Sequence, residues 1–152
     1  IAKITTAEVM RPARHVICRT TDTDTALEQL AKTVDGTCFL VDETGCLIGQ
    51  ITATDVMTAL RRKQPFSLDT IARKDVPTVT RHHPLKESVN RLTSARLPRL
   101  AVIDNEKNRH LVGELDAATA VATYHAAVER ARAEDQGLAT PSDISPTIPP
   151  RP

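Results

Sequence analysis

Aromatic side chains are almost absent from this chain of 152 residues, which contains two phenylalanines, one tyrosine and no tryptophan. Proteins that bind single-stranded nucleic acid stack the bases on aromatic rings, and this chain has too few rings for such a platform. A large net charge is also absent, since 20 Lys and Arg residues nearly balance 19 Asp and Glu residues and leave a net charge of +1. This balance leaves no field that would hold a phosphate backbone. We therefore expect no nucleic-acid partner.

Cysteine pairs and long apolar runs are missing as well. Cys18, Cys38 and Cys46 are odd in number and form no C-x-x-C pair, which argues against a disulfide framework or a zinc knuckle and favours a reducing compartment. No apolar run approaches the about 18 residues that a membrane helix requires. The expected location is cytoplasmic, either free or as the cytoplasmic domain of a membrane protein, with no direct insertion of this segment into the membrane.

The sequence also lacks a recognisable catalytic or metal-binding arrangement. No Ser, Cys or Lys is accompanied by a nearby base and orienting acid, and there is no phosphate-cradling glycine loop. His82 and His83 are neighbours at the end of an expected strand, so their side chains point to opposite faces, which favours a solvated loop. We expect no catalytic residue, no metal and no required cofactor. An enzyme whose active residues meet only in the folded chain remains an alternative.

What the chain does contain is an internal repeat at an offset of about 62 residues. Residues 24–30 align with residues 86–92, and residues 39–42 align with residues 101–104. Gly49 then aligns with Gly113, because two extra residues in the turn at 105–110 increase the offset. The chain is therefore a duplicated unit.

Each copy has the pattern of a β-α-β-β-α unit, so the expected fold class is α/β. In the first copy we expect strands at 15–19, 37–41 and 47–52 and helices at 23–34 and 54–62. In the second copy we expect strands at 78–81, 100–104 and 111–115, a helix from Pro84, and a helix at 117–134 with Ala117, Val121, Tyr124 and Val128 on its apolar face. The predicted units are residues 1–64 and 65–134, followed by a flexible proline-rich tail at 135–152.

Three segments of the first copy resemble the cystathionine-β-synthase (CBS) domain. They are Glu8-Val-Met-Arg-Pro12, the hairpin from Phe39 to Gly49, and Thr52-Ala-Thr-Asp-Val56. The second copy resembles it less closely through residues 75–79, 99–104 and 111–113. The resemblance implies a Bateman module, in which two CBS units pack about a pseudo-twofold axis, leave two clefts for adenosyl ligands and commonly form a homodimer. Such a module regulates an attached channel, transporter or enzyme.

A narrower likeness concerns the second hairpin and the last helix. The stretch at 104–113 and Ala122-Thr-Tyr-His-Ala126 resemble the cytosolic tail of bacterial ClC chloride channels and transporters. This likeness implies an attached membrane transport domain. Related modules also occur on magnesium transporters, dehydrogenases and kinases, or stand alone.

Asp55 is the main candidate for a binding residue. A ribose has two adjacent hydroxyls, and one ionised carboxylate can accept a hydrogen bond from each. Asp55 follows Ile51 and Thr52 of an expected strand and lies in the first turn of the helix that Thr54 is suited to cap. The N–H groups at this helix start and the hydroxyls of Thr52 and Thr54 suit a phosphate. The alternative is that Thr54 and Asp55 only cap a helix.

By resemblance, the adenine would lie against the strand that contains Val16, Ile17 and Cys18. In the second copy an acid, Asp116, stands where Thr52 stands in the first, and the ribose carboxylate is missing. A carboxylate near a phosphate is repulsive, so we predict one competent site per chain. The expected function is a regulatory module that binds AMP, ADP or ATP. The alternative is a structural dimerisation module without a ligand.

Overall fold

Two three-stranded sheets of identical topology form the centre of the molecule, which is a computed structural model that describes residues 3–137. The first sheet contains β1 (Val16–Cys18), β2 (Thr37–Val41) and β3 (Leu47–Thr52), and the second contains β4 (Thr78–Thr80), β5 (Arg99–Ile103) and β6 (Leu111–Asp116). In each sheet the first strand is parallel to the second, and the second is antiparallel to the third. The predicted α/β class and the repeated β-α-β-β-α order are confirmed.

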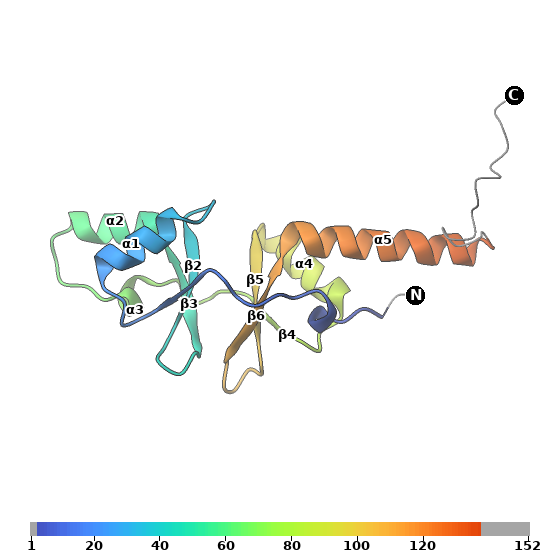
Figure 1. Ribbon diagram of the computed structural model, residues 1–152, viewed down its shortest axis with the longest axis horizontal. Helices are drawn as coiled ribbons and strands as arrows, with labels where there is room; N and C mark the ends of the chain where they lie inside the picture. The colour runs from blue at the N-terminus through green and yellow to red at the C-terminus, as the bar shows by residue number, and fades with distance from the viewer. Residues whose placement is uncertain (1–2, 138–152) are drawn as a thin grey trace, which may run out of the picture.

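Helices cover the outer face of each sheet (Figure 1). They are α1 (Thr23–Ala31) and α2 (Ala53–Arg61) in the first unit, and α4 (Leu85–Ala95) and α5 (Ala117–Asp135) in the second. Each unit buries its own cluster of aliphatic side chains between helices and sheet, centred on Leu40 and Ile51 in the first and on Val102 and Leu115 in the second. Among residues 3–137, no helix combines the length and the apolarity needed to cross a bilayer.

A third apolar cluster joins the two units between the inner faces of the sheets. It consists of Phe39, Leu47, Ala101 and Ile103, with Leu111 packed against them. Beyond it the two hairpins lie side by side (Figure 1) and are linked by backbone hydrogen bonds, from Leu47 N–H to the Arg109 carbonyl (2.7 Å) and from Leu111 N–H to the Gly45 carbonyl (3.0 Å). The two units are therefore packed against each other through an apolar cluster of their own and through backbone hydrogen bonds between the hairpins.

The segment that precedes each unit packs against the other unit. The N-terminal segment with η1 (Thr6–Glu8) crosses to the second sheet (Figure 1), where Arg11 and Glu114 exchange backbone hydrogen bonds of 2.9 and 2.8 Å. In the same way the segment with α3 (Leu68–Ile71) lies on the first unit, and Gln50 and Arg73 exchange two bonds of 2.8 Å. The boundary at residues 64 and 65 stays a prediction, but the packing crosses it twice.

These crossings explain why the repeat contains Gly49 and Gly113. A Cβ atom on Gly49 would lie 2.2 Å from the carbonyl oxygen of Arg73, and one on Gly113 would lie 2.8 Å from that of Arg11. Each glycine therefore leaves the space through which the other unit's leading segment passes.

Several local expectations differ from the structure. Helix α1 ends at Ala31, and Val34 lies beyond it with its side chain fully exposed, because the apolar spacing continues past the last residue that packs on the sheet. In α5 the fully buried positions are Ala120 and Ala127, and Val121 is 41% exposed. Helix α3 and η1 are too short to show a periodic pattern and were not predicted. Residue 135, where the flexible tail was expected to start, is the last residue of α5. Residues 138–152 of that expected tail lie outside the described part.

Candidate functional site

Helix α2 begins where strand β3 ends, and Thr52 caps it. The Thr52 hydroxyl oxygen accepts a hydrogen bond of 3.0 Å from the Asp55 N–H. Thr54, which was expected to be the cap, is instead an exposed residue inside the helix. The reason is that the strand pairing extends through Thr52, so helical geometry starts at Ala53 and a cap must precede it. Thr52 and Asp55 are thus brought together, and Thr54 points away from the core.

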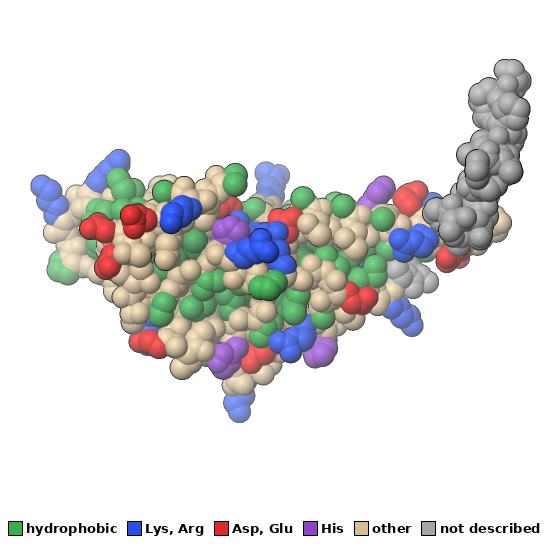
Figure 2. Space-filling view, viewed as in Figure 1, with side chains coloured by type: hydrophobic (Ala, Val, Ile, Leu, Met, Phe, Trp, Pro, Cys, Tyr) green, Lys and Arg blue, Asp and Glu red, His purple; other side chains and the backbone are tan. Residues whose placement is uncertain are grey.

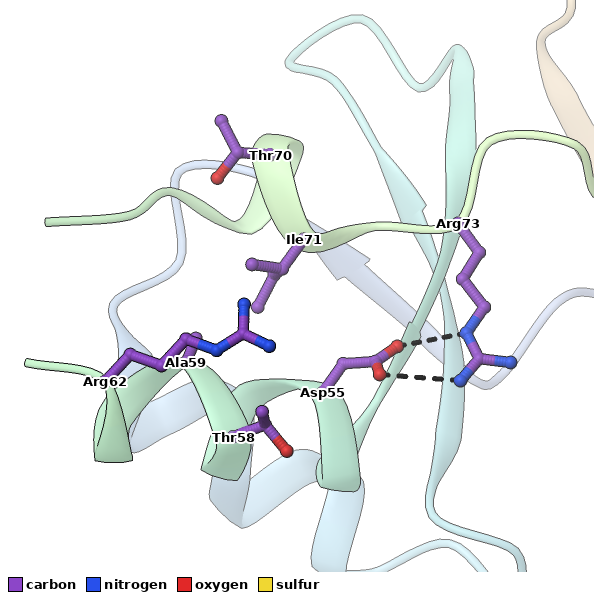
Figure 3. A pocket seen from close by; sticks show the side chains of 7 residues that line it. All are labelled: Asp55, Thr58, Ala59, Arg62, Thr70, Ile71 and Arg73. Carbon is purple, nitrogen blue, oxygen red and sulfur yellow. Dashed lines mark hydrogen bonds and ion pairs between the residues drawn. The ribbon is translucent and has the colours of Figure 1, made fainter. Parts of the chain in front are cut away.

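The carboxylate of Asp55 forms a two-point ion pair with Arg73 (Figure 3). Arg73 Nε lies 3.1 Å from Asp55 Oδ2, and Nη2 lies 3.4 Å from Oδ1. The Asp55 side chain is 25% exposed and that of Arg73 is 61% exposed. The hydrogen bond that Arg73 donates to Asp55, followed by the negative charge of Asp55, raises the pKa of Arg73 above its ordinary value. Sequence reasoning missed Arg73 because the two residues are 18 positions apart and meet only through the crossing segment.

The pair borders a hollow of about 300 Å³ between α2 and the crossing segment (Figure 3). Its walls are Asp55, Thr58, Ala59 and Arg62 from α2, and Thr70, Ile71 and Arg73 from the crossing segment. The hollow therefore combines one carboxylate, two hydroxyls, two guanidinium groups and an apolar wall. A carboxylate accepts hydrogen bonds from hydroxyls and guanidinium groups bind phosphates, so this set suits a ligand with a diol and an anionic group.

The four other residues predicted for the site lie elsewhere. Ile17 and Ile51 are buried in the core of the first unit and present no surface to a ligand. Cys18 is partly exposed, with its sulfur 3.3 Å from the hydroxyl of Thr20. Val16 lines a second hollow, of about 330 Å³, with His15 and with Gln29 of α1. The hollow beside α2 is instead completed by Thr70, Ile71 and Arg73 of the segment that precedes β4.

In the second unit the position equivalent to Asp55 is Thr119. Its N–H and hydroxyl both donate to Asp116, which caps α5 and whose pKa these bonds hold below its ordinary value. Asp116 also lies 3.7 Å from Arg11, the counterpart of Arg73. Arg11 in turn pairs at 2.9 Å with the fully buried carboxylate of Glu114. In the second unit, Arg11 is therefore surrounded by two carboxylates, and Thr119 stands at the position that Asp55 occupies in the first unit.

One further arginine connects the two units near this region. The guanidinium of Arg99 donates to the Asp35 carboxylate (3.2 Å), the Thr37 carbonyl (2.9 Å) and the Thr37 hydroxyl (2.7 Å). Its side chain is 9% exposed. Arg99 and Thr37 occupy equivalent positions of the repeat, which was the available signal that they would meet at the pseudo-twofold axis.

Side chains that could hold a metal ion do not gather anywhere within residues 3–137. Of the two adjacent histidines, His83 accepts from the Thr80 N–H at 2.9 Å and lies 3.7 Å from Glu87, whereas His82 borders a separate hollow. On the face shown in Figure 2, acidic and basic side chains of the described residues are interspersed and form no extended area of one sign.

The sequence matches the family model of the CBS domain twice, over residues 7–62 and 68–120. The chain belongs to the CBS-domain family. It contains a CBS pair, as the repeat and the quoted segments predicted. CBS domains are regulatory rather than catalytic modules, and the match indicates no enzyme family. No curated protein matches the sequence.

Solved structures share the fold at low sequence identity. OpuCA of Staphylococcus aureus is 23% identical with a TM-score of 0.65, over 78% of this chain and 97% of that one. CBSX2 in complex with AMP is 19% identical with a TM-score of 0.65, over 82% and 98%. The cytosolic domain of the Mg²⁺ channel MgtE in complex with ATP is 17% identical with a TM-score of 0.65, over 80% of this CBS pair and 49% of that chain.

At these identities the structures show the shared fold. They do not support the narrower likeness to the tails of ClC chloride channels, since MgtE is a magnesium channel and neither OpuCA nor CBSX2 is named as a chloride channel.

Proposed function

We propose that this CBS pair binds an adenine nucleotide of the AMP, ADP or ATP class in the hollow beside α2 and thereby regulates an attached protein. The observation that carries the proposal is the Asp55 carboxylate, placed at the start of α2 in a hollow that also contains Arg62 and Arg73. A volume of about 300 Å³ lies at the lower end of the range for small-ligand sites.

Each part of a nucleotide has a matching group in this hollow. The two oxygens of Asp55 have acceptor capacity beyond the pair with Arg73 and can receive the ribose hydroxyls. The phosphate would lie near Arg62 and Arg73, whose planar guanidinium groups bind phosphate oxygens at two points. Ile71 and Ala59 offer apolar surface to the base. AMP in CBSX2 and ATP in MgtE support this ligand class for the shared fold.

One competent site per chain is part of the proposal. In the second unit Arg11 is already paired with Glu114 and lies near Asp116, and Thr119 replaces the ribose carboxylate. A phosphate there would meet two carboxylates, one of them fully buried, so we expect no anionic nucleotide at that position.

Regulation would work through Arg73, which belongs to the segment that links the two units. A nucleotide whose ribose shares the Asp55 carboxylate with Arg73, and whose phosphate binds the Arg73 guanidinium, would shift Arg73 and with it the packing between the units. If the CBS pair has two packing arrangements, the nucleotide shifts the equilibrium between them by the difference in its binding free energy for each, and the attached protein responds to that shift. We propose a cytoplasmic location and a host such as a membrane transport domain or an enzyme.

Calorimetry with adenosine, AMP and ATP tests the site. Hydrogen bonds to a charged group contribute about 1.5 to 3 kcal/mol, so Asp55→Asn should weaken both adenosine and AMP roughly ten- to a hundredfold. The control is Asp24→Asn, which removes the same charge from the first turn of α1 and should leave affinity unchanged. Arg62→Gln should weaken AMP and ATP but not adenosine. Equal AMP affinity in wild type and Asp55→Asn would remove Asp55 from the site.

Homodimerisation is a second function that a specific observation favours. Met57 and Leu60 on α2 are each 42% exposed, and Val121 on α5, the repeat equivalent of Met57, is 41% exposed. Apolar side chains at equivalent positions of both units form the kind of two-sided surface that a symmetric dimer buries. In analytical ultracentrifugation, Met57→Glu/Val121→Glu should show a dimer affinity at least roughly tenfold weaker than that of wild type, whereas Gln64→Glu should leave the dimer affinity unchanged. Equal dissociation of all three proteins would exclude this surface.

A further inference from the structure

A larger hollow, of about 370 Å³, lies in the second unit, away from Asp55. Three segments that are distant in the sequence form it, namely the N-terminal segment, the start of α4, and the middle of α5, which lie next to one another in Figure 1. Its walls are Ile4, Pro84, Tyr124 and Val128, together with Lys3, Thr5, His82 and Lys86. The hollow is thus apolar inside and carries basic groups from two of its three sides.

Backbone hydrogen bonds and helix geometry hold these walls in place. Leu85 N–H donates to the Ile4 carbonyl at 2.7 Å, and Thr6 N–H donates to the His83 carbonyl at 2.9 Å. Tyr124 and Val128 are four residues apart on α5 and therefore lie on the same face of the helix. The hollow is therefore part of the folded unit.

The basic groups of this hollow have no charged partner among residues 3–137. Neither Lys3, His82 nor Lys86 makes an ion pair or a side-chain hydrogen bond with any described residue. The neighbouring carboxylates are engaged elsewhere, because Glu8 accepts from the N–H of Thr5 and Glu87 pairs with His83. By contrast, Arg73 in the α2 hollow is already paired with Asp55. Positive charge beside apolar surface is therefore available to a ligand.

We propose that this hollow binds a small organic anion with an apolar body, such as an aliphatic or aromatic carboxylate. The apolar body would pack against Tyr124 and Val128, and the carboxylate would lie between Lys3 and Lys86. The volume lies within the range of small-ligand sites. Such a ligand contacts both the segment that leads into the first unit and the last helix, and so fastens the N-terminal segment to α5. This site does not depend on nucleotide binding at Asp55.

The chain carries a built-in probe for this site. Tyr124 is the only tyrosine and there is no tryptophan, so tyrosine emission of the full chain reports on this hollow alone. We expect sodium octanoate to change Tyr124 emission in a saturable manner, and we expect octan-1-ol, which has the same apolar body without the charge, to bind at least several-fold more weakly.

The matched pair of variants is Lys3→Gln/Lys86→Gln against Lys32→Gln/Lys107→Gln, which removes the same charge at exposed positions outside the hollow. Lys3→Gln/Lys86→Gln should lower the affinity for octanoate roughly threefold to thirtyfold and leave the affinity for octan-1-ol unchanged. Lys32→Gln/Lys107→Gln should bind both compounds like wild type. Three results would overturn the proposal. They are no saturable change with octanoate, equal octanoate affinity in both variants, and Tyr124 emission that changes only on dilution of the protein, which would assign the hollow to a second copy.

Discussion

The substitution Gly49→Ala tests whether the crossing of the leading segments holds the two units together. A Cβ atom at this position would lie 2.2 Å from the carbonyl oxygen of Arg73, 2.9 Å from its carbonyl carbon and 3.2 Å from the Cα of Lys74. All three are backbone atoms, so no side-chain rotation relieves the overlap. The crossing segment must move away from β3.

The expected loss of stability follows from what this movement breaks. Gln50 and Arg73 exchange two backbone hydrogen bonds of 2.8 Å, and each contributes about 0.5–1.5 kcal/mol. Inserting a methyl group into a closely packed site adds about 1–3 kcal/mol. We therefore expect Gly49→Ala to lower the free energy of unfolding by about 2–6 kcal/mol, a large part of the 5–15 kcal/mol typical of a folded protein.

Urea denaturation followed by circular dichroism measures this loss, with Gly113→Ala as the reference. The equivalent contact there is 2.8 Å, so the reference should lose less stability than Gly49→Ala. Because Arg73 moves with the segment, AMP affinity should also fall more in Gly49→Ala than in Gly113→Ala. If Gly49→Ala unfolds within about 0.5 kcal/mol of wild type, the leading segment does not hold the units together as the structure indicates.

Two further predictions concern titratable groups. Burial raises the pKa of the Cys38 thiol to about 11, so this thiol stays protonated and unreactive at pH 8. Iodoacetamide at pH 8 should therefore label the partly exposed Cys18 and Cys46 of the native protein and leave Cys38 unmodified, as measured by mass spectrometry of tryptic peptides. Labelling of all three cysteines at one rate would contradict this. The bonds from Thr119 hold the pKa of Asp116 below its ordinary value of 3.8, so its contribution to stability is complete above about pH 4 and is lost as the pH falls through the lowered pKa. Asp116→Asn should therefore reduce the acid-induced loss of the free energy of unfolding below about pH 4, and identical pH profiles for wild type and variant would refute this origin.

Much of the fold could be predicted from local sequence, because short-range geometry determines it. Strand and helix periods recur in both copies, and Asp22, a residue type that favours helix starts, caps α1 by accepting a hydrogen bond from the Thr25 N–H. The aligned glycines and the turn residues also marked equivalent positions of the repeat. The local sequence pattern did not fix where each helix ends. Val34, for example, fits the apolar spacing of α1 but lies beyond its last residue, because periodicity does not show where packing on the sheet stops.

The sequence by itself determined the duplicated β-α-β-β-α unit, its family and the place of Thr52 and Asp55 where a strand leads into a helix. Only the tertiary structure decided what faces that turn. Arg73 pairs with Asp55 because each leading segment crosses to the other unit, and this separates Val16 from the hollow beside α2. Contacts of this kind depend on how distant segments pass one another in space, and neither residue spacing nor helix and strand periods carry that information.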